Sequence, residues 1–321
     1  MLFPAKRYGK SGYIDSAGEP QTDFRFDFFG CRAFSEGLAS VTEGGLAGFI
    51  NPQGDYVIGP QFDMAMGFSD GLARVEKGDR KGYIDKSGEF VITLDCYECE
   101  CFENGIAQVK PTITSRGNFI DKSGTVLFSE RNYLLSRYRE GLINCSEGKG
   151  WGYIDIHDQF VVKPIYKHAR PFFEAKAAVA PKRDLAGNPN RKDYFGFINS
   201  QSELVIEPRF RGADLRFSEG LCAVWDENYG YIDGAGEIAI PCEFYYCGDF
   251  SEGLAVYRLG KGKEFKYGFI DTAGRYAIET KFDHAESFSN GVAEVIVGDT
   301  YEDFRYGLID RSGEYIWEPT R

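Results

Sequence analysis

The 321-residue sequence has no run of about 20 apolar residues, which is the length that a membrane-spanning helix requires. Its first residues, Met1 to Arg7, lack a basic region followed by an apolar core, so they do not resemble a secretory signal. We therefore expect a cytoplasmic protein with no membrane partner. In that compartment its eight cysteines would stay reduced.

The residue patterns of common active sites are also missing. His157, His168 and His284 are scattered, without a His-x-x-x-His pair or a local context for a Ser-His-Asp triad. No glycine-rich phosphate loop leads from a strand into a helix, because the glycines follow a repeat instead. The sequence therefore predicts a protein that is not an enzyme and uses no cofactor.

Basic residues are fewer than acidic residues in this chain. The chain has 37 basic and 49 acidic residues, for a net charge of −12. An acidic surface repels phosphate backbones, so we expect no nucleic-acid partner. Such a surface would suit a basic protein partner, although it also serves solubility alone.

What the sequence does contain is a phrase of Gly, an aromatic residue, Ile and Asp that returns about every 35 residues. A period of this size indicates a solenoid, a propeller or another array of repeated units. Its nine occurrences, some of them degenerate, are at residues 12–15, 48–51, 82–85, 118–121, 152–155, 196–199, 230–233, 268–271 and 307–310.

Each unit reads as three short strands. In one unit they fall at 72–76, 81–85 and 89–92, where apolar and polar residues alternate and β-branched and aromatic types dominate. The sequence therefore predicts an all-β fold of about nine three-stranded meanders. Because repeated units bury their apolar faces against their neighbours, residues 1–321 are expected to form a single repeat domain.

Two turns recur with the strands. The phrase Asp85-Lys86-Ser87-Gly88 places an Asp where its carboxylate accepts amides two residues on, and a Gly where φ is positive. This turn role is favoured over metal binding for the repeated Asp. The linking phrase Phe68-Ser69-Asp70-Gly71-Leu72-Ala73 predicts a buried aromatic followed by a second tight turn.

These phrases, with Trp before the Gly at Trp151, resemble the bacterial WG-repeat (KWG-repeat) family over essentially the whole chain. Ser11, Ala47 and Lys81 are among the residues that replace this Trp in other copies. The resemblance implies a repeat architecture and a binding role, and it implies no chemistry.

Two architectures fit the repeat. An open β-solenoid or superhelix leaves the number of units free, whereas a closed propeller has four to eight blades of four strands in about 40–45 residues. Three strands in about 35 residues favour the open array. A closed, propeller-like array is the alternative.

The segment from Cys96 to Cys101 places three thiols close together, as a zinc site would require. Aligning the units undercuts that interpretation, because Cys99 falls in a slot that Ala65 and Ala285 occupy elsewhere. We expect Cys96, Cys99 and Cys101 to pack as small apolar residues and not to bind a metal.

Departures from the repeat suggest a binding site. The longest insertion, 181–194, extends a hairpin that is short elsewhere, and similar loops occur at 259–266 and 298–305. Insertions in arrays often mark the binding face, although surface drift also produces them. The candidate partner-binding residues are Lys182, Arg183, Asp184, Arg191, Lys192, Lys261 and Lys263.

The leading hypothesis is a non-catalytic protein-binding scaffold. Its specific form is an immunity or antitoxin-type protein that binds and blocks a partner, such as a basic toxin. The alternative is a sensor module that binds a small ligand or carbohydrate through aromatic side chains.

Overall fold

The computed structural model describes residues 1–113, 117–128, 134–148, 150–183, 193–211, 215–260, 265–298 and 303–320. Its regular secondary structure over these ranges consists of 33 β-strands, which confirms the predicted all-β fold. Over the same ranges, no helix is long and apolar enough to cross a membrane. The contacts divide the chain into two compact units, with residues 1–130, 298–308 and 315–321 in unit 1 and 131–297 and 309–314 in unit 2.

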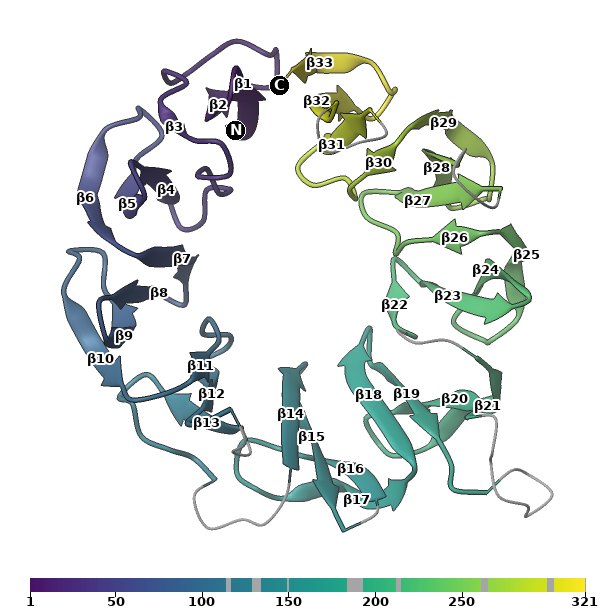
Figure 1. The fold of residues 1–321 in the computed structure, drawn as a ribbon. Coiled ribbons are helices and arrows are strands. Elements are labelled where there is room, and N and C mark those ends of the chain that lie inside the picture. The colour runs from purple at the N-terminus through teal and green to yellow at the C-terminus, as the bar shows by residue number, and fades with distance from the viewer. Residues whose placement is uncertain are drawn as a thin grey trace. The chain divides into compact units, whose positions relative to one another are not determined.

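The strands form nine small antiparallel sheets (Figure 1), each with its strands in chain order. The first sheet contains β1(Phe3–Arg7), β2(Lys10–Ile14) and β3(Phe26–Asp27), and the second contains β4(Ala39–Glu43), β5(Leu46–Ile50) and β6(Tyr56–Phe62). The third contains β7(Met64–Ser69), β8(Leu72–Lys77), β9(Arg80–Ile84) and β10(Phe90–Leu94), and the fourth contains β11(Glu98–Cys99), β12(Ile106–Lys110) and β13(Asn118–Asp121).

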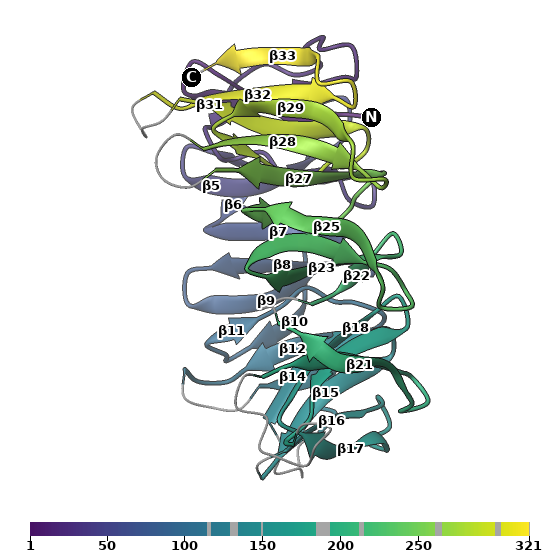
Figure 2. The same cartoon turned by 90° about the vertical axis from the view of Figure 1, so that its right-hand side faces the viewer.

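The next sheets have four strands each, and Figure 2 shows β27 and β28 of one such sheet side by side. They are β14(Leu134–Arg139), β15(Leu142–Glu147), β16(Gly150–Ile154) and β17(Phe160–Tyr166); β18(His168–Phe173), β19(Lys176–Ala180), β20(Phe195–Asn199) and β21(Leu204–Phe210); β22(Phe217–Ser218), β23(Leu221–Asp226), β24(Asn228–Ile232) and β25(Ile238–Phe244); β26(Tyr246–Cys247), β27(Leu254–Leu259), β28(Lys266–Asp271) and β29(Tyr276–Phe282); and β30(His284–Ala285), β31(Val292–Val297), β32(Arg305–Asp310) and β33(Tyr315–Thr320).

The prediction of three strands per unit is wrong for most sheets, because six of the nine have four. The extra strand comes from the segment that leads into the linking phrase, as β7 does when it pairs with β8. A β-bulge between Ala65 and Phe68 shifts the register there, so the alternation of apolar and polar residues breaks. Bulges of this kind hide the strand pattern of β7, β14 and β18 in the sequence, and β22, β26 and β30 are only two residues long.

The first and last strands of the chain lie together within unit 1 (Figure 1). The indole Nε1 of Trp317 on β33 donates a 3.0 Å hydrogen bond to the carbonyl of Lys6 on β1, and the hydroxyl of Thr320 donates to the same carbonyl. The Trp317 ring stacks on Phe24 with centroids 5.3 Å apart, and the Lys6 ammonium lies 4.0 Å from the centre of the Tyr306 ring.

An open solenoid would leave its two ends apart, so the prediction of an open array is wrong. The antiparallel four-stranded sheets and the contact between the chain ends support the closed, propeller-like alternative. The predicted open array rested on a count of three strands per unit, and that count missed the strand at the bulge.

The Asp turn occurs in all nine units as predicted. In each unit the side-chain oxygen of the Asp or Asn accepts backbone N–H groups from the residues two and four positions later, as Asp121 does from Ser123 at 2.8 Å and from Thr125 at 3.0 Å. Asn51 and Asn199 make the same pair of bonds without a charge. The turn role of these residues is therefore confirmed.

The linking phrase forms a hairpin turn with two consecutive residues of positive φ. In the turn of Glu36 and Gly37 these angles are 52° and 87°, and the flanking Ser35 and Leu38 exchange two backbone hydrogen bonds. The Gly at the second position is favoured because a side chain is strained at such angles. In the fifth unit Ala175 occupies this position with φ 58°.

The acidic residue of one linking turn accepts hydrogen bonds from the backbone of the following turn. The Glu36 carboxylate accepts the amide of Gly71, and Asp70 accepts that of Gly105. Within unit 2 the pattern is repeated by Glu140 with Glu174 and Ala175, by Glu174 with Gly220, by Glu219 with Gly253 and by Glu252 with Asn290 and Gly291.

The core lies between consecutive sheets. Phe49 of β5 packs against Phe68 of β7 with ring centroids 4.9 Å apart, and both belong to a buried cluster that continues to Ile84 of β9. The tyrosine of the repeated phrase also reaches the next sheet, since the hydroxyl of Tyr83 donates to the carbonyl of Glu100 at 2.6 Å. Each unit therefore completes its apolar core with its neighbour, as the repeat predicted.

We expect Ala175→Gly to stabilise the protein by about 0.5–1 kcal/mol, because it removes the cost of a side chain at positive φ. The reverse change in an equivalent turn, Gly253→Val, should destabilise it by about 1–3 kcal/mol. Urea unfolding of both variants measures the two effects. A lower midpoint for Ala175→Gly would contradict the strain.

A second prediction concerns acid. Hydrogen bonds from the side chains and backbone amides of their own turns lower the pKa of Asp85 and Asp121 below the usual value of 3.8. A carboxyl with a lowered pKa stabilises the fold above its unfolded pKa, and this contribution is lost as the pH falls from about 4 through the folded pKa. The double variant Asp85→Asn/Asp121→Asn keeps an acceptor but cannot titrate, so its stability should depend less steeply on pH there.

The control for this experiment is Asp79→Asn/Asp95→Asn, which removes two carboxyls outside the nine turns. Urea unfolding over the acid range measures all three proteins. Equal pH dependence in the turn variant and the control would show that these turns do not contribute to acid sensitivity.

Candidate functional site

A groove of about 810 Å³ opens in unit 2 beside the end of the longest insertion. Its walls come from β21, β23 and β25 and include Tyr194, the last residue of that insertion. Its volume lies within the range of known ligand sites. The groove is therefore the candidate functional site.

Aromatic and charged side chains converge in this groove. The guanidinium of Arg211 lies 4.4 Å from the centre of the Trp225 ring and 3.5 Å from the Asp226 carboxylate. Arg209, near the end of β21, donates a 2.6 Å hydrogen bond to the carbonyl of Gly236. Trp225 is half-buried, so part of its ring area remains open to a binding partner.

The arrangement suits binding more than chemistry. Both arginines of the groove have acidic neighbours, Asp226 for Arg211 and Glu237 for Arg209, so the charges are balanced. The flat Trp225 ring offers contact area, and the ion-paired arginines beside it offer N–H donors at fixed positions. The centres of protein interfaces combine the same two features.

The predicted partner-binding residues are only partly described. Lys182 and Arg183 are exposed and directly follow β19, at the base of the longest insertion. Asp184, Arg191, Lys192, Lys261 and Lys263 lie outside the described residues. The insertions do join the strand pairs β19–β20, β27–β28 and β31–β32, which are the hairpins that the repeat predicted.

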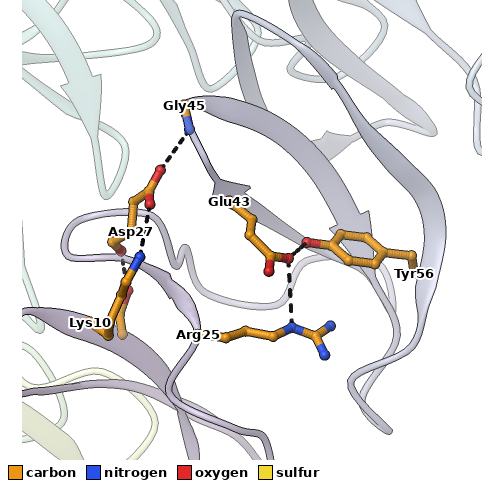
Figure 3. Close-up of polar contacts among 7 residues, drawn as sticks. Lys10, Arg25, Asp27, Glu43, Gly45 and Tyr56 are labelled. Atoms are coloured by element: carbon orange, nitrogen blue, oxygen red, sulfur yellow. Dashed lines mark hydrogen bonds and ion pairs between the residues drawn. The ribbon is translucent and has the colours of Figure 1, made fainter.

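A second polar cluster, in unit 1, is shown in Figure 3. Asp27 accepts a 2.9 Å hydrogen bond from the amide of Gly45 and pairs with Lys10, and Glu43 accepts the hydroxyl of Tyr56 at 2.6 Å. Burial and the nearby Glu43 carboxylate raise the pKa of Tyr56, which keeps this hydroxyl a donor.

The remaining member of the cluster in Figure 3 is Arg25, whose Nε lies 3.7 Å from the Glu43 carboxylate and which also donates to the carbonyl of Gly54. The amide of Gly45 is the main reason why the pKa of Asp27 is lowered. Each charge in this cluster faces an opposite charge or a backbone group. The cluster therefore holds β3 and β4 together and is not a candidate site.

Of the three neighbouring cysteines, Cys99 packs in the core as the sequence predicted, and Cys96 and Cys101 are partly exposed. Cys99 is 1% exposed in a core cluster with Tyr83 and Phe102, and Cys222 is fully buried at the position that Ala39 occupies in its own unit. Burial raises the pKa of Cys96 to about 12, so the thiolate that a metal needs is disfavoured. The residues that the structure describes contain no group of His, Cys, Asp and Glu suited to a metal ion.

Sequence reasoning missed the groove residues, because Arg209, Arg211 and Trp225 fall on regular strands or their ends. One signal was present in the repeat: the position of Trp225 carries the charged residues Glu76 and Lys110 in other units. A position that carries charged residues in other units is exposed to solvent. An aromatic ring at that position therefore lies at the surface.

Solved structures are similar to this chain at low sequence identity. A structure titled as the crystal structure of the eukaryotic initiation factor is 11% identical with a TM-score of 0.65, and the match covers 100% of this chain and 96% of that chain. AztD of Citrobacter koseri is 10% identical with a TM-score of 0.43, covering 100% and 93%. The β-propeller domain of the Trilobed protease from Pyrococcus furiosus is 9% identical with a TM-score of 0.41, covering 99% and 98%.

The likeness to the initiation factor shows a shared fold and does not extend to activity. No curated protein sequence matches the chain. A family model described as WG containing repeat matches seven segments that together make up more than half of the chain. They are residues 12–46, 48–80, 82–110, 151–180, 195–224, 229–263 and 267–301.

For the cysteines we predict slow alkylation. Because burial raises the pKa of Cys96 and Cys247 to about 12 and that of Cys31 to about 11, iodoacetamide at about pH 8 should label the folded protein far more slowly than the urea-unfolded protein. Peptide mass spectrometry measures each site. Rapid labelling of Cys99 in the folded protein, or one zinc ion per chain after purification, would contradict the packing role.

Proposed function

The chain belongs to the WG-containing repeat family, and on that basis we propose that it is a non-catalytic scaffold that binds another protein. The observation that carries the proposal is the groove beside the longest insertion, where the half-buried Trp225 lies under the Arg211 guanidinium. Trp, Tyr and Arg are the residue types that most often supply binding energy at protein interfaces.

The groove and the base of the insertion would form one binding surface. Tyr194 lines the groove, and the described residues Lys182 and Arg183 stand at the other end of the same insertion. A partner segment laid along the groove would therefore also reach the insertion. This placement supports the loop hypothesis for Lys182 and Arg183 and extends it to Trp225 and Arg211.

In its specific form, the proposal is an immunity or antitoxin-type protein that covers the active site of a basic toxin in the cytoplasm. The net charge of −12 supports a basic partner, because complementary charge speeds encounter and disfavours wrong partners. The basic residues around the insertion would then contact acidic groups of that partner and set its orientation.

The second candidate is a sensor for a small ligand or carbohydrate. It is favoured by one observation, the open face of Trp225 near Tyr194 in a groove whose volume suits a small molecule. Many other aromatic residues belong to the core, among them the fully buried Tyr13, Phe49 and Phe68. These buried rings cannot line a binding surface. The sensor hypothesis is therefore supported by the groove alone.

The test is affinity capture from the native host. Wild type is compared with a variant in which residues 182–193 are replaced by a short Gly-containing turn, and with Trp225→Ala. We expect one partner that wild type captures and both variants lose, since removal of a central interface Trp commonly costs at least about 2 kcal/mol. Tyr276→Ala removes an aromatic ring that is 52% exposed outside the groove and is the matched control.

The same partner captured by all four proteins would place the interface elsewhere. If no partner is captured, a thermal-shift screen of sugars and nucleotides decides the alternative, because a ligand stabilises the folded state by mass action. Stabilisation by a sugar in wild type that disappears in Trp225→Ala would overturn the scaffold in favour of the sensor.

A further inference from the structure

A second, smaller cavity of about 290 Å³ lies in unit 2, apart from the groove. We call it the arginine pocket, and its defining residues are Arg137, Asn144, Trp151, His168, Arg170 and Arg216. They come from β14, β15, β16 and β18 and from the segment before β22. The pocket thus gathers side chains from three successive units of the repeat.

The arginines arrive there by the same local geometry. β14 and β18 each carry a β-bulge, between Leu135 and Tyr138 and between Ala169 and Phe172. Arg137 and Arg170 lie inside these bulges, which redirect side chains away from the regular alternation. Arg216 directly precedes the linking Phe217, as Arg137 precedes Tyr138. Gly67, Cys101 and Asp249 hold that position in other units.

The positive charge of the pocket is only partly neutralised. Arg216 forms an ion pair with Asp249, and the His168 ring lies 3.7 Å from the Asp193 carboxylate. Among the described residues, Arg137 and Arg170 have no carboxylate within ion-pair distance. Two uncompensated guanidinium groups in one small cavity of an acidic protein indicate a place for an anion.

Asn144 supplies a second and independent observation. Its side chain is 3% exposed, and its Nδ2 donates a 3.0 Å hydrogen bond to the carbonyl of Ala169. Its Oδ1 accepts no hydrogen bond, and neither does the buried Nε of Arg170 donate one. Buried polar atoms nearly always have partners, because an unsatisfied one costs about 1–3 kcal/mol.

The equivalent residue in the second unit shows that a carbonyl is not needed for folding. Ser40 occupies the position of Asn144, and its hydroxyl donates to the carbonyl of Ala65 at 3.0 Å. This bond is the counterpart of the one from Asn144 to Ala169. The structural task at this position is thus a single donor, and the Oδ1 of Asn144, a residue that lines the pocket, is an additional acceptor.

We propose that the arginine pocket binds a small hydroxylated anion, with its acidic group on Arg137 and Arg170 and its hydroxyl donating to Asn144 Oδ1. Arginine fits phosphate and carboxylate groups alike through paired N–H donors. Trp151 and Phe173 would cover the carbon skeleton of the ligand. The site does not depend on the proposed protein partner, because its residues are distinct from those of the groove.

Isothermal titration calorimetry of the full chain at low salt tests this inference with three probes. Glycerol 3-phosphate and glycerate carry the same hydroxylated skeleton with a phosphate or a carboxylate, and glycerol carries no charge. We expect at least one of the two anions to bind and glycerol to give no heat. Which anion binds more tightly distinguishes a phosphate ligand from a carboxylate ligand.

Two substitutions connect that binding to the pocket. Arg137→Gln removes one exposed guanidinium, and Asn144→Ser removes the free carbonyl while keeping the donor that Ala169 needs. Each should weaken the binding of the anion about tenfold or more. Arg275→Gln, which removes an equal charge from an 80% exposed side chain elsewhere in unit 2, should change nothing.

Retention of the wild-type thermal midpoint by Asn144→Ser shows that the variant is folded. Absence of heat with both anions at millimolar concentration would overturn the proposal. So would binding that Arg137→Gln and Asn144→Ser leave unchanged, or inorganic phosphate binding as tightly as glycerol 3-phosphate, since the hydroxyl contact would then contribute nothing.

Discussion

The structure depends on a carboxylate held by the backbone of the next repeat. Each linking turn has two residues of positive φ, and the acidic residue of one turn accepts amides of the turn that follows, as Glu36 does from Gly71. The short linking phrase specifies two things. It sets the turn conformation that exposes the amides, and it supplies the side chain that accepts them. Local geometry and the spacing between repeats are therefore fixed together.

This arrangement explains where the repeat tolerates change. The phrase keeps a residue able to adopt positive φ, and most copies keep an acid, although Asn104 and Asn290 replace it in two of them. Even the fifth unit, which has lost its Gly, retains Glu174, and its carboxylate accepts the amide of Gly220. The hairpins at the opposite ends of the strands vary more in length from unit to unit. The long insertions fall in those hairpins, and the groove opens beside one of them.

The turns and the core could be predicted from the sequence because their causes are local. An Asp or Asn whose side chain accepts the amides two and four residues later specifies this turn, and all nine turns form, including the two in which Asp158 and Ser202 replace the Gly. The fourth strand of a sheet, such as β7, was missed because its bulge hides the alternation of apolar and polar residues on which strand prediction rests. The contact of Trp317 with Lys6 was missed because it joins residues 311 positions apart through side chains that the repeat does not share.

Only part of the candidate site could be inferred in the same way. The sequence identified the insertion at 181–194 and so led to the base of the groove, where Tyr194 lies. The roles of Trp225 and Arg211 depend on which strand ends meet at one edge, and that is a property of packing between units. The arginine pocket left a weak trace in the sequence, as an Arg just before the linking aromatic residue at Arg137 and Arg216, in units that are separated by one other.

The contact between the chain ends is made by side chains, and among the described strands β1 and β33 share no sheet. In an array closed by a shared strand, one sheet is assembled from both termini and the position of the termini is fixed. Here no described sheet mixes the first and last strands, so each sheet is formed by one continuous segment of the chain. Such an architecture can gain or lose whole units by duplication or deletion, and can be circularly permuted, without leaving any sheet incomplete.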